Sequence, residues 1–203
     1  MSAKALFVGM EARSGKQTDV ADFLRGAREV VKQEIDTKEW YALRFGDSSF
    51  AIFDTFPGSA GRLKHLVGGV GRRLVVETFR ILSGLPELAL FDIIAAKKPP
   101  LSADPQLALF VRLKARSGQE EAITTLLRDA LPDVQAETGT VAWYALKTGF
   151  SSFAICDVFA TEADRDAHLS GSVANTLRAR SAELFDGAPD IRKAQVLASQ
   201  IKA

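Results

Sequence analysis

The chain repeats itself at a spacing of 103 residues, and this repeat limits its possible folds more than any other feature. Residues 5–15 read ALFVGMEARSG and residues 108–118 read ALFVRLKARSG, with eight of eleven positions identical. Both tryptophans, both tyrosines and both histidines of the chain are paired at the same spacing. A long period with only two copies indicates a duplicated domain, because a solenoid needs at least three stacked units.

The boundary between the two copies lies in a short proline-bearing segment. Residues 97–105 read KKPPLSADP, a composition typical of a loop because it combines prolines with few apolar side chains. We therefore expect one domain over residues 1–98, a linker over 99–106 and a second domain over 107–203.

Each copy changes its hydrophobic period several times along its length. A β-branched and aromatic composition predicts strands, and apolar residues at helical spacing predict helices between them. In the first copy the strands are expected at 5–13, 37–45, 48–56 and 87–96, with helices from about 20 to 31 and from about 59 to 83. The second copy follows 103 residues later, with Pro132 expected to kink or stop its first helix and Thr161 to cap its second.

The predicted order β-α-β-β-α-β is that of a ferredoxin-like module, an antiparallel sheet with both helices on one face. Such a sheet leaves its second face bare, and an apolar face has to be covered. The other copy is the natural cover. We therefore predict an α+β fold in which two ferredoxin-like modules form an intrachain dimeric α+β barrel. This pseudo-dimer leaves a further homodimer open.

The charge balance argues against two classes of partner. With 26 basic and 25 acidic residues the net charge is +1, which provides no broad positive field for nucleic acid or an anionic membrane. The apolar run near the N-terminus is too broken for a signal peptide, and no segment has the length of a membrane span. We expect a cytoplasmic protein. Its one cysteine, Cys156, corresponds to Phe53 and is interpreted as an apolar filler.

Two matched segments carry a family resemblance: SFAIFDTF followed by RLKHLVGGV, and SFAICDVF followed by RDAHLSGSV. With this element order the chain resembles the antibiotic biosynthesis monooxygenase family. The resemblance implies a monooxygenase that uses no metal or flavin cofactor and acts on an aromatic or quinol-like small molecule. The deprotonated substrate would itself reduce oxygen. The alternative is a protein of the same fold that binds a small ligand or serves assembly, without enzymatic activity.

Asp54 and Asp157 are the first candidate catalytic residues. Strand alternation places Asp54 in phase with Phe50, Ile52 and Phe56, and a carboxylate among apolar side chains has its pKa raised toward the range of a general base. The competing interpretation is a structural aspartate that pairs with an arginine on the following helix. Arg62 and Arg165 are the candidates for that pairing, and they are also candidates for substrate binding.

His65 and His168 are the second pair of candidate catalytic residues. Each follows an arginine by three residues, and this charge is expected to favour the neutral imidazole, which can act as a base. A straight helix would direct His65 away from the apolar face and toward solvent. A break at Gly68 and Gly69 would instead let the first helical segment turn His65 toward a pocket.

The paired aromatic residues are candidates for substrate binding. Trp40 and Trp143 share a strand face with Arg44 and Lys147, so an aromatic beside a cation could bind a planar anion or form a cation–π contact at an interface. Tyr41 and Tyr144 lie on the other strand face. Each copy has one histidine and no cysteine pair, so no metal site is predicted.

Overall fold

The computed structural model describes residues 3–203 and divides the chain into two compact units. Unit 1 consists of Met1–Phe91 together with Ala194–Ala203, and unit 2 consists of Asp92–Lys193. These units differ from the sequence repeats at one element, the last strand of each copy. Strand β4 (Glu87–Lys97) passes into unit 2 after Phe91, and β8 (Asp190–Ile201) passes into unit 1 after Lys193.

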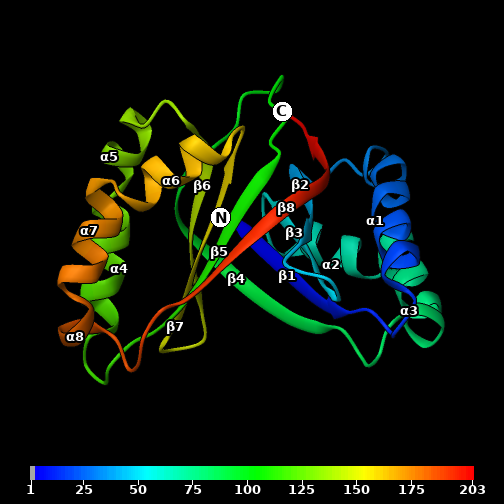
Figure 1. The fold of residues 1–203 in the computed structure, drawn as a ribbon, viewed down its shortest axis with the longest axis horizontal. Coiled ribbons are helices and arrows are strands. Elements are labelled where there is room, and N and C mark those ends of the chain that lie inside the picture. The colour runs from blue at the N-terminus through cyan, green and yellow to red at the C-terminus, as the bar shows by residue number, and fades with distance from the viewer. Residues whose placement is uncertain (1–2) are drawn as a thin grey trace. The chain divides into compact units, whose positions relative to one another are not determined.

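Unit 1 is an antiparallel sheet with its helices on one face. Strand β3 (Ser49–Phe56) lies between β1 (Lys4–Glu11) and β2 (Glu39–Arg44), and the end of β8 pairs with β2. Figure 1 shows α1 (Gln17–Val31) beside α3 (Gly69–Ile81), with the short helix α2 (Ser59–Leu66) between β3 and α3 in the chain.

Unit 2 repeats this arrangement. Strand β7 (Ser152–Phe159) lies between β5 (Leu107–Lys114) and β6 (Thr140–Thr148), and the end of β4 pairs antiparallel with β6. Its helices are α4 (Glu120–Asp129), α5 (Leu131–Ala136), α6 (Glu162–Leu169), α7 (Ser172–Ala179) and α8 (Ser181–Leu184). The α+β class and the order β-α-β-β-α-β in each copy are therefore as predicted.

The helix interruptions follow from identifiable residues. In unit 2 the first helical segment is divided just before Pro132, which cannot donate a backbone hydrogen bond, whereas α1 runs without a break. The hydroxyl of Thr161 accepts a hydrogen bond from the Asp164 backbone N–H at 3.2 Å and caps α6, as expected. In unit 1 the predicted break falls at Gly68, where α2 has ended and α3 begins.

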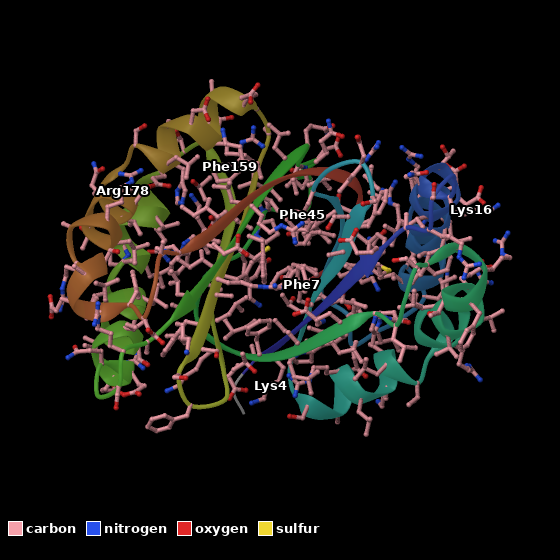
Figure 2. The ribbon with its side chains drawn as sticks, turned by 60° about the horizontal axis from the view of Figure 1, so that its bottom comes forward. Lys4, Phe7, Lys16, Phe45, Phe159 and Arg178 are labelled. Carbon is pink, nitrogen blue, oxygen red and sulfur yellow. The ribbon has the colours of Figure 1, made fainter. Side chains whose placement is uncertain are left out.

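The two faces of the unit 1 sheet bury different sets of side chains. The helix-facing side packs strand residues such as Val8 and Ile52 against Val20 and Leu24 of α1. Side chains of the opposite side alternate with these along each strand, and they include Phe7 and the stacked pair Tyr41 and Phe53. Figure 2 labels Phe7 and Phe45, whose ring centroids lie 6.4 Å apart on that side.

Within residues 3–203, no helix combines the length and the apolar character needed to cross a membrane.

Candidate functional site

Asp54 occupies the helix-facing side of β3 in the middle of the unit 1 core. It pairs directly with Trp40 of β2 and with Leu6 of β1, and its exposed fraction is 0%. The alternation of β3 that places it among apolar side chains is the one predicted from the sequence. A carboxylate in this position needs a polar partner from the helix layer.

His65 of α2 supplies that partner and links Asp54 to a second carboxylate. Its Nε2 lies 3.0 Å from Oδ2 of Asp54, and its Nδ1 lies 2.5 Å from Oε2 of Glu34. The hydroxyl of Thr37 donates to the same Glu34 oxygen at 2.7 Å. The imidazole is thus held between two carboxylates, one fully buried and one at the edge of the helix layer.

Unit 2 contains the same arrangement 103 residues later. Nδ1 of His168 lies 2.6 Å from Oε2 of Glu137, and its Nε2 lies 3.6 Å from Oδ2 of Asp157. Thr140 donates to Glu137 at 2.6 Å. We call the two sets, Glu34–His65–Asp54 and Glu137–His168–Asp157, the carboxylate–histidine clusters. The same polar arrangement therefore recurs in both units, at matching positions 103 residues apart.

The histidines of both clusters have raised pKa values and favour the protonated imidazolium, whereas the sequence led us to expect a neutral imidazole. Burial favours neutral imidazole, but the Asp54 and Glu34 carboxylates outweigh it and raise the pKa of His65 to about 10. The expectation of a neutral histidine is therefore wrong, because it considered only the neighbouring arginine. The expectation of a solvent-facing histidine on a straight helix is also wrong, since the ring of His65 is buried at the end of a short helix.

The buried aspartates carry raised pKa values in both units. Burial raises the pKa of Asp54, and the charge of His65 offsets only part of the effect. Burial raises the pKa of Asp157 to about 7, and the charge of His168 offsets part of this effect. The raised values agree with the sequence-based expectation for a carboxylate among phenylalanines.

The two arginines proposed as partners of the aspartates bind elsewhere. Arg62 donates to the backbone carbonyls of Ala5 and Phe91 at 3.3 and 3.1 Å. Arg165 pairs with Glu162 at 2.8 Å, one turn earlier on its own helix. The interpretation of an aspartate–arginine pair is corrected to an aspartate–histidine pair.

The aromatic candidates divide between the two sheet faces. Trp40 and Trp143 lie directly opposite Asp54 and Asp157, fully buried, and among the described residues neither indole N–H has a hydrogen-bond partner. Oδ1 of each aspartate also has no partner within residues 3–203. Tyr41 and Tyr144 are buried on the opposite sheet face, as strand alternation requires, so they are not part of the clusters.

An apolar cavity of about 320 Å³ opens beside His65 in unit 1. Its inner part is formed by residues of the sheet and of α2, including Leu6 and Ile52, the neighbours of Asp54 on the helix-facing side. Its outer part is formed by α3 and the segment that leads into β4. The rim residues Val75, Phe79, Leu85 and Leu88 are all more than half exposed.

A lysine at or near the end of β4 and of β8 binds the backbone of the segment that carries the glutamate of each cluster, Glu34 or Glu137. In unit 1 the Lys202 ammonium donates to the backbone carbonyls of Val31 and Glu34. In unit 2 Lys97 donates to the carbonyls of Val134 and Glu137 at 3.0 and 2.5 Å. Each lysine therefore stabilises the end of the helical segment from which the glutamate reaches its histidine.

Sequence reasoning missed Glu34 and Glu137, although the repeat contained a signal for them. Both glutamates and the threonines three residues later, Thr37 and Thr140, recur at the spacing of 103. Most other residues of these two loops differ between the copies. The recurrence of a glutamate and a threonine at the spacing of 103 was therefore a signal that could have identified them.

The described part of the chain contains no group of three or more His, Cys, Asp or Glu side chains placed to hold a metal ion. The carboxylate–histidine clusters do not form one because their two carboxylates meet opposite edges of the imidazole, so the oxygen atoms do not converge.

Similar proteins are found among solved structures, whereas no known family model and no curated protein matches the chain. A protein of Fusobacterium nucleatum that is named a putative monooxygenase matches at a TM-score of 0.85 and 13% identity, covering 100% of this chain and 95% of that one. An anthrone oxidase-like protein matches at a TM-score of 0.68 and 11% identity, over 98% of this chain and 92% of its own. These matches span both copies and support the α+β barrel fold predicted from the sequence.

A shorter match has a higher identity. A protein of unknown function from Nitrosomonas europaea is 49% identical over 49% of this chain and 96% of its own, with a TM-score of 0.47.

Proposed function

We propose that the chain is a cofactor-independent monooxygenase acting on an aromatic or quinol-like small molecule, with a site in unit 1. The observation that carries the proposal is the position of His65, a charged imidazole on the wall of an apolar cavity with a buried carboxylate beside it. The fold shared with proteins named as monooxygenase-like and anthrone oxidase-like supports the same reaction class. Fold likeness alone is a weak argument, so the site chemistry decides the mechanism.

The cavity suits a planar apolar molecule. Its volume of about 320 Å³ lies at the small end of the range for small-ligand pockets, and aliphatic side chains form most of its wall. In this proposal the ring system lies between the sheet and α3, and a hydroxyl or enol group lies toward His65. A positive charge there favours the deprotonated form of that group, because the surroundings screen little of the charge.

The proton acceptor is Asp54 in this mechanism. Its pKa is raised by burial, which brings a carboxylate closer to the range in which it accepts a proton near neutral pH. Oδ2 faces His65, so Oδ1, which has no partner among the described residues, is the atom left to accept the proton. Asp54 does not itself line the cavity, so the substrate hydroxyl has to pass the cavity wall at His65 to reach it. The histidine remains an imidazolium and stabilises the substrate anion, while Glu34 fixes the ring from the other side.

The remaining chemistry belongs to the substrate and oxygen. The substrate anion transfers electrons to O2 and forms a carbon–oxygen bond; the O–O bond then breaks, with one oxygen kept as a carbonyl and the other leaving as water. A CH2 group activated by the ring system is thereby converted to C=O, and the two electron pairs that reduce O2 both come from the substrate.

An oxygen-electrode assay with a panel of hydroquinones and anthrone tests the proposal. We expect substrate-dependent oxygen consumption that Asp54→Asn lowers by about a hundredfold or more, the usual range for removing a general base. Asp157→Asn is the matched control in the other unit and should retain most of the activity. Turnover at the uncatalysed rate for every compound, or equal losses in both variants, would refute the assignment of the reaction to unit 1.

The second candidate is a binding protein without catalysis, favoured by the complete burial of Asp54. In that case the cluster would be a structural element and the cavity a ligand site. Ligand affinity with no oxygen consumption, unchanged in Asp54→Asn, would establish this function instead.

A further inference from the structure

The residues that form the inner wall of the cavity in unit 1 recur at the equivalent positions of unit 2, whereas the residues of the outer wall differ. Residues that line its inner part in unit 1 are identical 103 positions later, including Leu6 with Leu109 and Ile52 with Ile155. The rim is different. Val75, Phe79 and Leu85 correspond to Arg178, Ala182 and Ala188.

Arg178 occupies a specific place in unit 2. Its guanidinium donates to the backbone carbonyl of Leu169 and, at 2.5 Å, to Oδ1 of Asn175. In unit 1 the equivalents of Leu169 and Arg178 are Leu66 and Val75, and both line the cavity. The hydrogen bond of unit 2 therefore joins two positions whose equivalents both line the cavity of unit 1. Figure 2 labels Arg178 on α7.

The helices on this side also differ. In unit 1 the outer wall is one continuous helix, α3, whereas the matching segment of unit 2 is divided into α7 and α8 at Arg180. Replacement of Phe79 and Leu85 by alanines removes two large apolar side chains from the rim, whereas the position of Leu88 stays apolar as Ile191. The cluster of unit 2 is thus retained beneath a rim in which three of the four apolar side chains of unit 1 are exchanged for an arginine and two alanines.

We propose that unit 1 alone binds ligand, that the ligand is an uncharged apolar molecule whose body extends to the exposed rim, and that Arg178 closes the equivalent site of unit 2. The proposal rests on the ligand site of the proposed function but not on its chemistry. The charge and hydrogen bonds of Arg178 explain the closure, because an apolar ligand entering there would have to displace a guanidinium bound to a backbone carbonyl.

Reciprocal substitutions at the equivalent residues Val75 and Arg178 test the proposal. The neutral fluorophore N-phenyl-1-naphthylamine is titrated into the full-length protein, and the number of bound molecules per chain is measured. We expect one for the wild type and a loss of affinity of about tenfold or more for Val75→Arg, because the guanidinium would then lie at the rim and could bind the Leu66 carbonyl as Arg178 binds that of Leu169. Arg178→Val should add a second, weaker site, since Ala182 and Ala188 provide less apolar contact.

Each outcome has a defined meaning. Two equivalent sites in the wild type, full affinity in Val75→Arg, or a single site in both Arg178→Val and Arg178→Ala would overturn the inference. Both exchanged positions are exposed, and circular dichroism confirms that the variants fold. A wild type that binds no probe would overturn the ligand site of unit 1; binding gained only by Arg178→Val would then still identify Arg178 as a closing residue. Turnover without the expected stoichiometry would retain the proposed function and refute this inference.

Discussion

His65 should remain protonated far above the pH at which a free histidine loses its charge. Its pKa is raised from 6.5 to about 10, although burial acts in the opposite direction, because Asp54 and Glu34 hold the imidazolium from both sides. A group with a raised pKa contributes stability that is fully present below its unfolded pKa and is lost as the pH rises through the folded one. The affected window is therefore about pH 6.5 to 10.

The magnitude follows from counting protons. Between pH 7 and 9 the folded state holds one proton on His65 that the unfolded state has released. One proton corresponds to about 1.4 kcal/mol per pH unit, so this group alone lowers the free energy of unfolding by roughly 2–3 kcal/mol over those two units. A loss of this size is a substantial part of the stability of a small domain.

Imidazole 15N NMR measures the titration directly. His65 and His168 are the chain's only histidines, so the spectrum contains two pairs of imidazole nitrogen signals, one pair for each ring, and His168→Gln assigns them. We expect the His65 signal to keep the shifts of an imidazolium at pH 8. Urea unfolding at pH 7 and 9 then gives the accompanying change in the free energy of unfolding.

The double variant Asp54→Asn, His65→Gln is the control, because it removes the charge of both groups and leaves polar side chains of similar size. Between pH 7 and 9 the wild type should lose roughly 2–3 kcal/mol more of its free energy of unfolding than this variant loses. A His65 signal that titrates near pH 6.5, or the same pH dependence in both proteins, would contradict the charge assignment.

Three further predictions concern the supports of the site and core. Lys202→Ala should destabilise unit 1 by about 1–3 kcal/mol through the loss of charged hydrogen bonds to the backbone that carries Glu34, and chemical denaturation of this variant against the wild type measures it. Cys156, fully buried with a thiol whose pKa is raised by burial, should not react with Ellman's reagent until the protein unfolds, and rapid labelling in native buffer would contradict its burial. Leu24→Ala should cost about 2–5 kcal/mol in urea unfolding, whereas Arg25→Ala on the exposed side of α1 should change stability by less than about 0.5 kcal/mol.

Much of the fold could be predicted because it depends on local periodicity and on the repeat. The strand alternation that places Asp54 toward the helices, the break at Gly68 and the interruption before Pro132 each follow from a few neighbouring residues. The sequence analysis named Asp54 and His65 as separate candidate residues but did not predict that they form a pair.

The electrostatics of the site could not be predicted from nearest neighbours in the sequence. Arg62 is close to His65 along α2, yet it donates to backbone carbonyls of β1 and β4 and leaves the imidazole to carboxylates. Glu34 lies 31 residues from His65 in the chain, and only the folded structure brings the segment that follows α1 beside the end of α2. The nearest charge in the sequence, that of Arg62, therefore does not determine the protonation of His65; the carboxylates do.

The supporting lysines depend on strand pairing rather than on the repeat. Lys97 and Lys202 hold equivalent carbonyls, but they are 105 residues apart, since 202 − 97 = 105, and the strict repeat does not align them. The position of each lysine depends on where its strand, β4 or β8, ends. A comparison at the repeat spacing of 103 residues therefore does not match the two lysines.

The divided strands β4 and β8 have a consequence for how the two copies could evolve. A single copy would need a second molecule to supply the end of the strand beside β2, so its folded population would depend on concentration, and any mutation would change both sites at once. Joining the copies in one chain turns that association into an intramolecular step at an effective concentration in about the millimolar range. It also lets one copy change alone. A difference such as that between Val75 and Arg178 is possible in two linked copies and impossible in a symmetric homodimer, whose chains carry identical residues.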